Sequence, residues 1–452
     1  MMQIKSKKIA ILGFGREGKS LLKFLRNRGF TRIYPPKFSG GKFRRVKLID
    51  ADRNQEIWVL DRKGTGIPWG VKRQIGKNYL KNLKDFDIVF RSPGVPYNLP
   101  ELKKARQAGV KFSSATKIFF ENYKGKVIGI TGTKGKGTVS TLIYQILKTS
   151  GKRVFLAGNI GRSVLEFVSP NKKYDFAILE LSSFQLQDLE RSPSLAVMLD
   201  VFPDHLDAHQ NLKEYYDSKT NLVAYQRKGD KVFYFLDNAL SRKSALRGAG
   251  KKTGVDYRKF KLFSQNDLKI RGVHNYRNAV MAATVAKYLK ISKKVILTAV
   301  KKFKGLEHRL EFVRKIREVS IYNDSISTNP QTAVAAVESF PKEMKILIAG
   351  GRDKNLNYNY KPLGAALGKL KTEMRLVVLG GENKRRVQEM IKGSGVKVKL
   401  SENLRQAVKI AYAAAKNKKG VMIFSPGAKS FDSFKDYAHR GRNFKTIVKS
   451  LK

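Results

Sequence analysis

The residues best suited to chemistry lie in a glycine-rich segment at positions 125–138, with the sequence GKVIGITGTKGKGT. Its glycines leave backbone N–H groups open to a ligand, and Lys136 adds a mobile positive charge. This combination can hold the phosphates of a nucleoside triphosphate. The segment departs from the usual pattern, because Gly137 follows the lysine and Thr138 stands one position later. A tight turn with a solvated lysine is therefore the alternative.

The flanking residues indicate how this segment is held. The apolar run at residues 127–130 predicts a buried strand, and residues 139–148 place apolar side chains on one face of a helix. A glycine turn between them brings phosphate oxygens to a helix N-terminus, where free N–H groups and the helix dipole attract anions. The pattern therefore predicts a nucleotide site.

Possible metal ligands follow the next two predicted strands, at residues 176–179 and 195–199. Glu180 ends the first of them, where a carboxylate can reach a Mg²⁺ held by a triphosphate. His205 and His209 follow the second with a spacing that alone would suit Zn²⁺. No third clear ligand accompanies them, so a dedicated zinc site is not expected.

A second glycine turn, GFGREG at residues 13–18, follows a predicted strand at 8–12 and precedes a predicted helix at 20–28. In this setting the pattern favours a pyrophosphate at a helix N-terminus, with an acid at the end of the second strand to bind a ribose. Asp61 is the preferred acid and Asp50 is its rival. A packing turn without a ligand is the alternative.

Strand and helix patterns alternate through the whole chain and predict an α/β fold with open parallel sheets. We expect three domains: a Rossmann-like domain at 1–115, a central phosphate-loop ATPase-type domain at 116–305, and a C-terminal Rossmann-like domain at 306–452. Residues 31–55 read as an insertion or a small hairpin, and residues 275–289 as a helix. The remaining predicted strands are residues 56–60, 87–90, 320–322, 345–348, 376–379 and 421–424.

Composition restricts the class of protein. No run approaches the ~18 apolar residues of a membrane span, so no membrane insertion is expected. The N-terminal apolar run is short and leads into a glycine turn, which indicates a first strand and not a signal peptide. The chain has no cysteine, which excludes disulfides and thiolate chemistry and permits a reducing cytoplasm.

The net charge is unusual, because 92 Lys and Arg against 36 Asp and Glu give +56. Such a charge is typical of proteins that bind nucleic acid or another polyanion. The basic residues are nevertheless dispersed over nearly every predicted helix and loop. We therefore favour a lysine-rich bias of solvated faces, and a nucleic-acid partner stays open.

Ten segments, in order, resemble the ATP-dependent Mur ligases of peptidoglycan synthesis. Each is weak alone, but together they cover nearly the whole chain. They are GITGTKGKGT, GNIG, ELSSFQL, DHLDAH, YYDSK, GVHNYRNA, GLEHRLE, NDSISTNP, GGRDK and SPGAKSFDSF.

The resemblance implies an activity that uses ATP and Mg²⁺ in the cytoplasm. A carboxylate attacks the γ-phosphate to give an acyl phosphate, and the amine of an amino acid then displaces phosphate. The segments ELSSFQL and SPGAKSFDSF, with the GFGREG opening, are similar to the branch that adds D-glutamate to UDP-N-acetylmuramoyl-L-alanine. The alternatives are another Mur-type ligase or a ligase that extends folate with glutamate. A less favoured alternative is a basic ATPase that binds nucleic acid.

The resemblance also implies roles for individual residues. Catalytic roles fall on Lys136, His205, Lys219 and Arg309. ATP binding falls on Gly132, Thr133, Lys134, Gly135, Lys136, Gly137, Thr138, Asn275, Asn278, Arg309 and Asp324. Binding of the UDP-linked substrate falls on Gly15, Arg16, Asp61, Ser92, Gly94 and Asn159, and binding of D-glutamate on Thr328, Lys354, Ser430 and Tyr437. The implied metal ligands are Thr138, Glu180, His205 and Lys219.

Two of these implied features have plain alternatives. Lys219 matches a carbamylated lysine of the family, whereas by itself it reads as a surface lysine. Asn275 matches an adenine contact, whereas an asparagine there could equally cap a helix. The family likeness also implies that the third domain closes over the nucleotide, and residues 307–309 are our hinge hypothesis.

Overall fold

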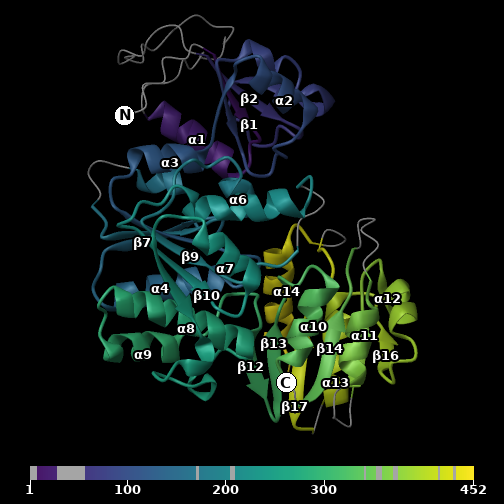
Figure 1. Ribbon diagram of the computed structural model, residues 1–452. Helices are drawn as coiled ribbons and strands as arrows, with labels where there is room; N and C mark the ends of the chain where they lie inside the picture. Colours follow the sequence, from purple (N-terminus) through teal and green to yellow (C-terminus); the bar gives the residue numbers. More distant parts are fainter. Residues whose placement is uncertain are drawn as a thin grey trace, which may run out of the picture. The chain divides into compact units, whose positions relative to one another are not determined.

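The computed structural model describes residues 8–27, 56–168, 173–203, 209–340, 343–352, 359–369, 375–415, 418–430 and 434–451. The chain separates into two compact units, both drawn in Figure 1. Unit 1 comprises Met1–Phe260 and Val280–Ile296, and unit 2 comprises Lys261–Ala279 and Leu297–Lys452. The predicted insertion at residues 31–55 lies outside the described residues.

The first sheet of unit 1 has five parallel strands in the order β3-β2-β1-β4-β5. Figure 1 labels β1 and β2 of this sheet. Its central strand, β1 (Lys8–Leu12), is a run of buried apolar residues, as expected where helices cover both faces. The strand order reverses at β1, the position where such sheets bind ligands. The other elements are α1 (Arg16–Arg26), β2 (Glu56–Asp61), β3 (Lys72–Ile75), η1 (Gly76–Asn78), η2 (Leu83–Asp85), β4 (Ile88–Arg91), α2 (Pro100–Gln107), β5 (Lys111–Ser113) and α3 (Ala115–Asn122).

The second sheet of unit 1 has six parallel strands in the order β11-β10-β9-β6-β8-β7. Its central strand, β6 (Lys126–Thr131), leads into the glycine-rich segment. The other elements are α4 (Lys136–Thr149), β7 (Val154–Gly158), η3 (Val164–Phe167), β8 (Phe176–Glu180), α5 (Ser183–Leu186), β9 (Leu195–Met198), α6 (Leu212–Ala224), β10 (Lys231–Phe235), α7 (Ala239–Leu246), β11 (Lys251–Val255) and η4 (Tyr257–Lys259). Helices α8 (Val273–Tyr288) and α9 (Lys293–Lys302) contribute residues to both units.

One hydrophobic core joins the two sheets of unit 1. Its buried side chains include Ile11 and Leu22 from the first sheet and its helix, and Leu179 and Met198 from the second sheet. Because the two sheets share this core, loops at the ends of both are held close to one another.

Unit 2 is built on a sheet in the order β12-β13-β17-β14-β15-β16, in which β12 is antiparallel to β13 and the other pairs are parallel. Separate apolar clusters cover its two faces, one containing Phe444 and the other Phe340. Its elements are η5 (Gln265–Asp267), β12 (Glu311–Ile316), β13 (Val319–Asn323), α10 (Pro330–Glu338), β14 (Met344–Ala349), α11 (Lys361–Gly368), β15 (Arg375–Leu379), α12 (Lys384–Ile391), β16 (Lys397–Leu400), α13 (Leu404–Ala415), β17 (Gly420–Phe424) and α14 (Tyr437–Lys449).

The predicted α/β class and parallel sheets are confirmed, and every predicted strand overlaps an observed one. Two predicted helices begin earlier than expected. The helix predicted at 20–28 begins at Arg16, and the one predicted at 139–148 begins at Lys136, because both start on the glycine turns themselves. The predicted domain limits near residues 115 and 305 stay predictions, since contacts divide the chain into two units and not three.

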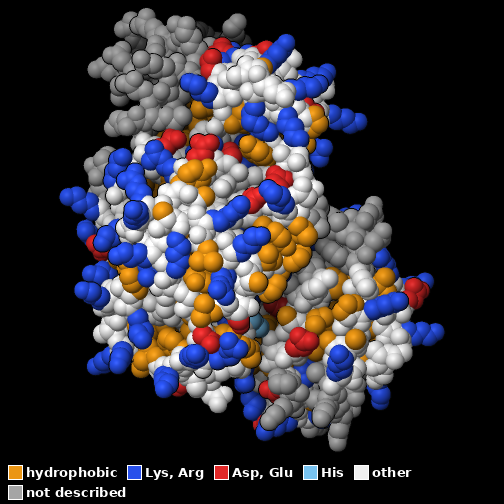
Figure 2. Space-filling view, viewed as in Figure 1, with side chains coloured by type: hydrophobic (Ala, Val, Ile, Leu, Met, Phe, Trp, Pro, Cys, Tyr) orange, Lys and Arg blue, Asp and Glu red, His pale blue; other side chains and the backbone are white. Residues whose placement is uncertain are grey.

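The surface carries the dispersed charge that the sequence predicts. Figure 2 shows Lys and Arg side chains spread over the visible face and interleaved with other side chains. Within the described part of the chain, no helix is long and apolar enough to cross a membrane.

Candidate active site

The glycine-rich segment forms the turn between β6 and α4. Gly135 caps the helix with a φ of +83°, and Gly132 has a φ of +150°. A Cβ atom on Gly132 would lie 2.7 Å from the Cβ atom of Leu199, so both conformation and space require glycine there. Lys136 is the first helical residue, which places the free N–H groups of the first turn beside it. This is the geometry of an anion site.

The side chain of Lys136 folds back over this turn. Its Nζ atom donates to the carbonyl oxygens of Gly132, at 2.9 Å, and of Thr133, at 3.2 Å. The Thr133 hydroxyl lies 2.8 Å from the hydroxyl of Tyr215 on α6, which anchors the turn to that helix. Thr138 is buried in the first turn of α4, whereas Lys134 is exposed.

Lys219 is not a surface lysine. It lies on α6 with only 2% of its surface exposed, and its Nζ atom donates to the carbonyl oxygen of Gly132 at 3.0 Å. The same ammonium lies 4.6 Å from the centre of the Tyr215 ring, at cation–π distance. The structure therefore brings Lys136 and Lys219 to one oxygen atom.

The burial of Lys219 could have been predicted from the apolar residues around it in the sequence, although not from the lysine alone. Tyr215, Leu222 and Val223 are buried on the same helix, and Lys219 stands four residues after the first and three before the second. A lysine in the middle of an apolar helical stripe is expected to face the core.

Glu180 ends β8 with 5% of its surface exposed. It lies opposite Ile130 of β6 in the sheet register, one residue pair away from the start of the glycine-rich turn. Its Oε1 atom accepts a hydrogen bond from the side-chain amide of Asn159 at 2.7 Å. A buried carboxylate at this edge offers the oxygen ligand that Mg²⁺ prefers.

Of the two predicted histidines, the structure describes one. His205 lies outside the described residues. His209 is buried, and its Nε2 atom lies 3.0 Å from the Ser183 hydroxyl while its ring stacks on Phe184. Among the described residues, the only three His or carboxylate side chains close enough together to share a metal ion are Glu307, His308 and Glu311 of unit 2.

All the residues predicted for the UDP-linked substrate except Asn159 lie at the carboxyl ends of β1, β2 and β4. Gly15 caps α1, and the Ser92 hydroxyl donates to the carbonyl of Gly13 at 2.7 Å. Gly94 is exposed two residues later. Asn159 follows β7 of the second sheet.

Asp61 is engaged with the glycine turn. Its Oδ2 atom accepts from the N–H of Phe14 at 2.7 Å, and its Oδ1 atom accepts from the N–H groups of Lys63 and Gly64. Burial opposes ionisation of Asp61, but these hydrogen bonds outweigh it and hold its pKa below the ordinary value. Asp61 is therefore an ionised carboxylate at the turn.

In unit 2, Asp324 directly follows β13 and is buried. It accepts hydrogen bonds from the Ser425 hydroxyl at 2.7 Å and from the Leu310 N–H at 3.1 Å. Burial raises the pKa of Asp324 to about 7, against the opposing effect of these bonds and of nearby Arg309 and Arg440. The structure thus brings the predicted residues Arg309 and Asp324 into one neighbourhood.

The predicted D-glutamate residues follow neighbouring strands of unit 2. Thr328 follows β13, Ser430 follows β17, and Tyr437 begins α14, with β17 lying next to β13 in the sheet. Ser430 is buried and Tyr437 is 40% exposed. Lys354 lies outside the described residues.

Asn275 and Asn278 on α8 are both largely buried. The side-chain amide of Asn275 donates to the carbonyl of Arg271 at 2.7 Å. Because Asn275 is the third residue of α8 and its side chain donates to a carbonyl, this contact is not the N-cap hydrogen bond considered as the alternative, and the predicted adenine contact stays a prediction.

Residues 307–309, for which a hinge was hypothesised, take part in a hydrogen-bond network that the sequence did not predict. His308 is buried with a φ of +64°, and its Nδ1 atom lies 2.9 Å from the Asn323 side-chain amide. Lys445 of α14 donates to Glu307 at 2.6 Å and to Glu311 at 2.9 Å. Glu307, His308 and Glu311 lie close enough together to share a metal ion, but the Lys445 ammonium already bridges the two carboxylates.

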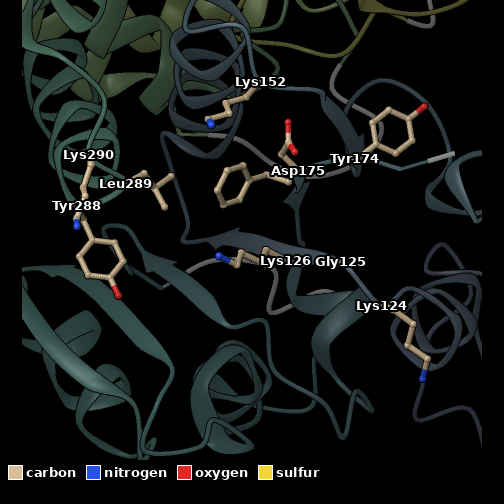
Figure 3. A pocket seen from close by; sticks show the side chains of 10 residues that line it. Lys124, Gly125, Lys126, Lys152, Tyr174, Asp175, Tyr288, Leu289 and Lys290 are labelled. Atoms are coloured by element: carbon tan, nitrogen blue, oxygen red, sulfur yellow. The ribbon is translucent and has the colours of Figure 1, made fainter.

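A cavity of about 720 Å³ lies in unit 1, away from the glycine-rich turn (Figure 3). Lys126 and Phe176, which line it, are the first residues of β6 and β8, so it opens at the amino edge of the sheet. Lys152 and Lys290, also in its lining, follow the ends of α4 and α8. Basic side chains are stabilised at helix C-termini, which accounts for them without a ligand.

The sequence matches known families over most of its length. The Mur ligase middle domain matches residues 130–292, and the Mur ligase glutamate ligase domain matches residues 308–427. The UDP-N-acetylmuramoylalanine–D-glutamate ligase of Acetivibrio thermocellus is 34% identical, over 99% of this chain and 97% of that protein. The enzyme of the same name from Ruminiclostridium cellulolyticum is 32% identical, over 99% and 98%.

Solved structures agree on the fold. The UDP-N-acetylmuramate-alanine ligase of Thermotoga maritima has a TM-score of 0.60 at 17% identity, over 98% of this chain and all of that one. The MurF ligase of Thermotoga maritima in complex with ADP has a TM-score of 0.56 at 18% identity, over 89% of this chain and 91% of that one. At these identities the likeness concerns the fold alone.

Proposed function

This chain belongs to the Mur ligase family, and on that premise we propose that it joins D-glutamate to the carboxylate of UDP-N-acetylmuramoyl-L-alanine. It is an ATP-dependent ligase of peptidoglycan precursor synthesis, like the relatives that match nearly its whole length. The choice of D-glutamate rests on the names of those relatives. The reaction belongs in the cytoplasm, where ATP and UDP-linked sugars are found.

The geometry that carries the proposal is the convergence of Lys136 and Lys219 on the carbonyl oxygen of Gly132. Lys136, at a glycine turn and a helix N-terminus, forms an electropositive site for phosphate, and Lys219 lies beside it where a carbamylated side chain would reach a metal ion held by that phosphate. The triphosphate of ATP is an anion of the kind that such a site binds. In the reaction, Lys136 exchanges its bonds to the turn for bonds to the β- and γ-phosphates.

The donor set fits Mg²⁺. Glu180 provides a buried carboxylate next to the turn, and Thr138 provides a hydroxyl in the first turn of α4. Oxygen ligands of this kind suit a hard divalent cation, which would neutralise phosphate charge when bound. His205 and a carbamylated Lys219 complete the proposed set.

The chemistry asks the protein to position groups and to stabilise charge. The substrate carboxylate attacks the γ-phosphorus, an O–P bond forms, and ADP leaves. The amine of D-glutamate then attacks the acyl carbon, loses a proton, and displaces inorganic phosphate. The phosphate loop holds the triphosphate in line, and Arg309 and Asp324 keep the nucleotide-binding roles that the family likeness implies.

The subsites for the UDP-linked substrate and for D-glutamate can also be proposed from the charges of these two substrates. The UDP pyrophosphate would lie at the N-terminus of α1, where Gly15 leaves the backbone open. The two carboxylates of D-glutamate would bind Thr328, Ser430 and Tyr437 together with Lys354. Hydroxyls and a lysine are suitable partners for a dianionic amino acid.

Phosphate release tests the proposal. The full chain is incubated with ATP, Mg²⁺ and UDP-N-acetylmuramoyl-L-alanine, and amino acids are added one at a time. Only D-glutamate should stimulate release. Stimulation by another amino acid, or by a folate in place of the UDP-linked substrate, would assign a different ligase activity.

Lys136→Ala tests the phosphate site, with Lys152→Ala as its matched control. Turnover should fall below detection, because the γ-phosphate loses its cation. Lys152→Ala removes an equal charge at the opposite edge of the same sheet and should keep full turnover. Release stimulated by random DNA and independent of amino acids would point instead to a nucleic-acid-binding ATPase.

A further inference from the structure

The two charged residues of the first glycine turn, Arg16 and Glu17, are engaged with loops of the second sheet. The Arg16 guanidinium donates to three backbone carbonyls, those of Gly161 at 2.6 Å, Gly158 at 2.9 Å and Asn159 at 3.2 Å. Glu17 accepts from the side-chain amide of Gln185 at 2.8 Å. All of these residues lie in unit 1.

The acceptors of Arg16 form the sharp GNIG turn that follows β7. Gly158 has a φ of +103° and Gly161 a φ of +70°. A Cβ atom on Gly158 would lie 2.3 Å from the carbonyl oxygen of Glu180, so the turn is pressed against the end of β8. Three carbonyl dipoles that point to one place repel one another, and a planar cation with several N–H donors relieves that repulsion.

The same turn holds Glu180. The Asn159 N–H donates to the Glu180 carbonyl at 2.8 Å, and the Asn159 side-chain amide donates to Glu180 Oε1 at 2.7 Å. One residue thus fixes both the backbone and the carboxylate of Glu180. Arg16 in turn holds Asn159 in place through a hydrogen bond to the backbone carbonyl of Asn159.

We propose that Arg16 is a positioning residue for Glu180. By binding the GNIG turn, it directs the Asn159 amide onto one carboxylate oxygen and leaves the other oriented toward the divalent cation of the nucleotide. The inference rests on the proposed function for the role of Glu180. It differs from that proposal in giving Arg16 a task on the ATP side of the reaction, where the family likeness implied contact with the UDP-linked substrate.

Two consequences distinguish a positioning role from a substrate contact. Loss of Arg16 weakens metal–nucleotide binding even when the UDP-linked substrate is absent. It also raises the KM for Mg-ATP and leaves the KM for the UDP-linked substrate unchanged. Groups that orient a metal ligand contribute roughly 10- to 100-fold to metal affinity, and Arg16 is exposed to solvent, so about 10-fold is expected.

The experiment measures Mn²⁺ binding by electron paramagnetic resonance in the presence of β,γ-methylene-ATP, with no other substrate. Arg16→Ala should weaken Mn²⁺ binding about 10-fold. Arg16→Lys, which keeps the charge but loses the planar fork, should fall between the variant and the wild type. Lys23→Ala, an exposed charge on the same helix, should bind as the wild type does.

A double-mutant cycle with Asn159→Ala tests the route through that residue. If Arg16 acts through Asn159, the double variant should bind Mn²⁺ no more weakly than Asn159→Ala alone. Fully additive losses would overturn the inference. Melting temperatures of all variants identify any general loss of folding. If Arg16→Ala is poorly folded, Arg16→Lys replaces it in the comparison with the wild type.

The remaining outcomes separate this inference from the proposed function. If Arg16→Ala raises only the KM for the UDP-linked substrate, Arg16 is a substrate contact and the inference is wrong, while the proposed function stands. If the wild type shows no D-glutamate-dependent phosphate release, the proposed function fails. The Mn²⁺ measurement still decides the positioning role in that case.

Discussion

The ammonium groups of Lys136 and Lys219 donate to the same carbonyl oxygen, that of Gly132, at 2.9 and 3.0 Å. Two like charges that share one acceptor repel each other, and the repulsion is strong because Lys219 is buried. Carbamylation of Lys219 would turn one of the cations into an anion and the repulsion into attraction. This is a physical reason for the modification that the family likeness implies.

Lys219→Ala tests that modification. Turnover should fall ~10²–10³-fold, the usual loss when one group that stabilises transition-state charge is removed. Short carboxylates such as acetate or formate should restore part of it, because they can occupy the space of the carbamate. Mass spectrometry of the native wild type should show one added CO₂. Failure of every carboxylate to restore turnover would speak for an unmodified lysine.

Gly132→Ala tests the close packing of the phosphate loop. The new Cβ atom would meet Leu199 at 2.7 Å, at a φ of +150° that side chains rarely adopt. We expect a loss of about 2 kcal/mol or more in the free energy of unfolding, together with loss of ATP binding. Chemical denaturation and a fluorescent nucleotide measure the two effects. Gly229→Ala has open space around it and should change neither.

The sequence was informative about most buried strands and poor at sheet edges, although the buried interior strand β10 (KVFYF) was also missed. β1 and β6 are continuous apolar runs, because both faces of a parallel sheet are covered, and they were predicted. β3 and β16 were missed, since the edge strands KRQI and KVKL carry mostly exposed or half-buried basic side chains and no hydrophobic pattern. Local pattern therefore fails where pairing with a neighbouring strand decides the structure.

In the candidate site, too, local features could be predicted from the sequence and long-range contacts could not. Glycine turns and their lysine are local features, so the phosphate loop was readable from residues 125–138 alone. The hydrogen bond between Arg16 and Asn159 joins residues 143 positions apart, and the one between Lys445 and Glu307 joins the segment of the hinge hypothesis to α14. Such partners are set by the packing of whole elements, and no spacing rule reveals them.

The net charge of +56 predicts a salt-dependent stability. Self-repulsion destabilises the compact state more than the expanded one, and salt screens it. The melting temperature should rise between low and moderate NaCl, and a polyanion such as tripolyphosphate should raise it at lower concentration. An uncharged osmolyte of equal osmolarity is the control. A melting temperature that stays constant with salt would contradict the expectation.

Lys445→Met tests the network around His308. The variant removes the cation that bonds both Glu307 and Glu311 and leaves their charges beside a buried imidazole. We expect a loss of roughly 1–3 kcal/mol in the free energy of unfolding, discounted because Glu307 is largely exposed. Lys449→Met, on the same helix but exposed, should cost only a few tenths. Denaturant unfolding at neutral pH compares the two.

Asp324 should make stability depend on pH. Burial raises its pKa in the folded state from 3.8 to about 7, so the folded chain binds a proton that the unfolded chain has already released over this range. The unfolding free energy contributed by this group therefore falls as pH rises from about 4 to 7 and levels off above that.

Asp324→Asn removes the titration and keeps an oxygen that can accept from Ser425 or Leu310. The variant should gain stability relative to the wild type as pH rises from 5 to 8, while its ATP-dependent turnover falls, because a carboxylate proposed for the nucleotide is lost. Thermal melts across this pH range, taken as differences between the two proteins, cancel the titration of other groups. A difference that does not change with pH would show that Asp324 titrates at its ordinary pKa in the folded chain.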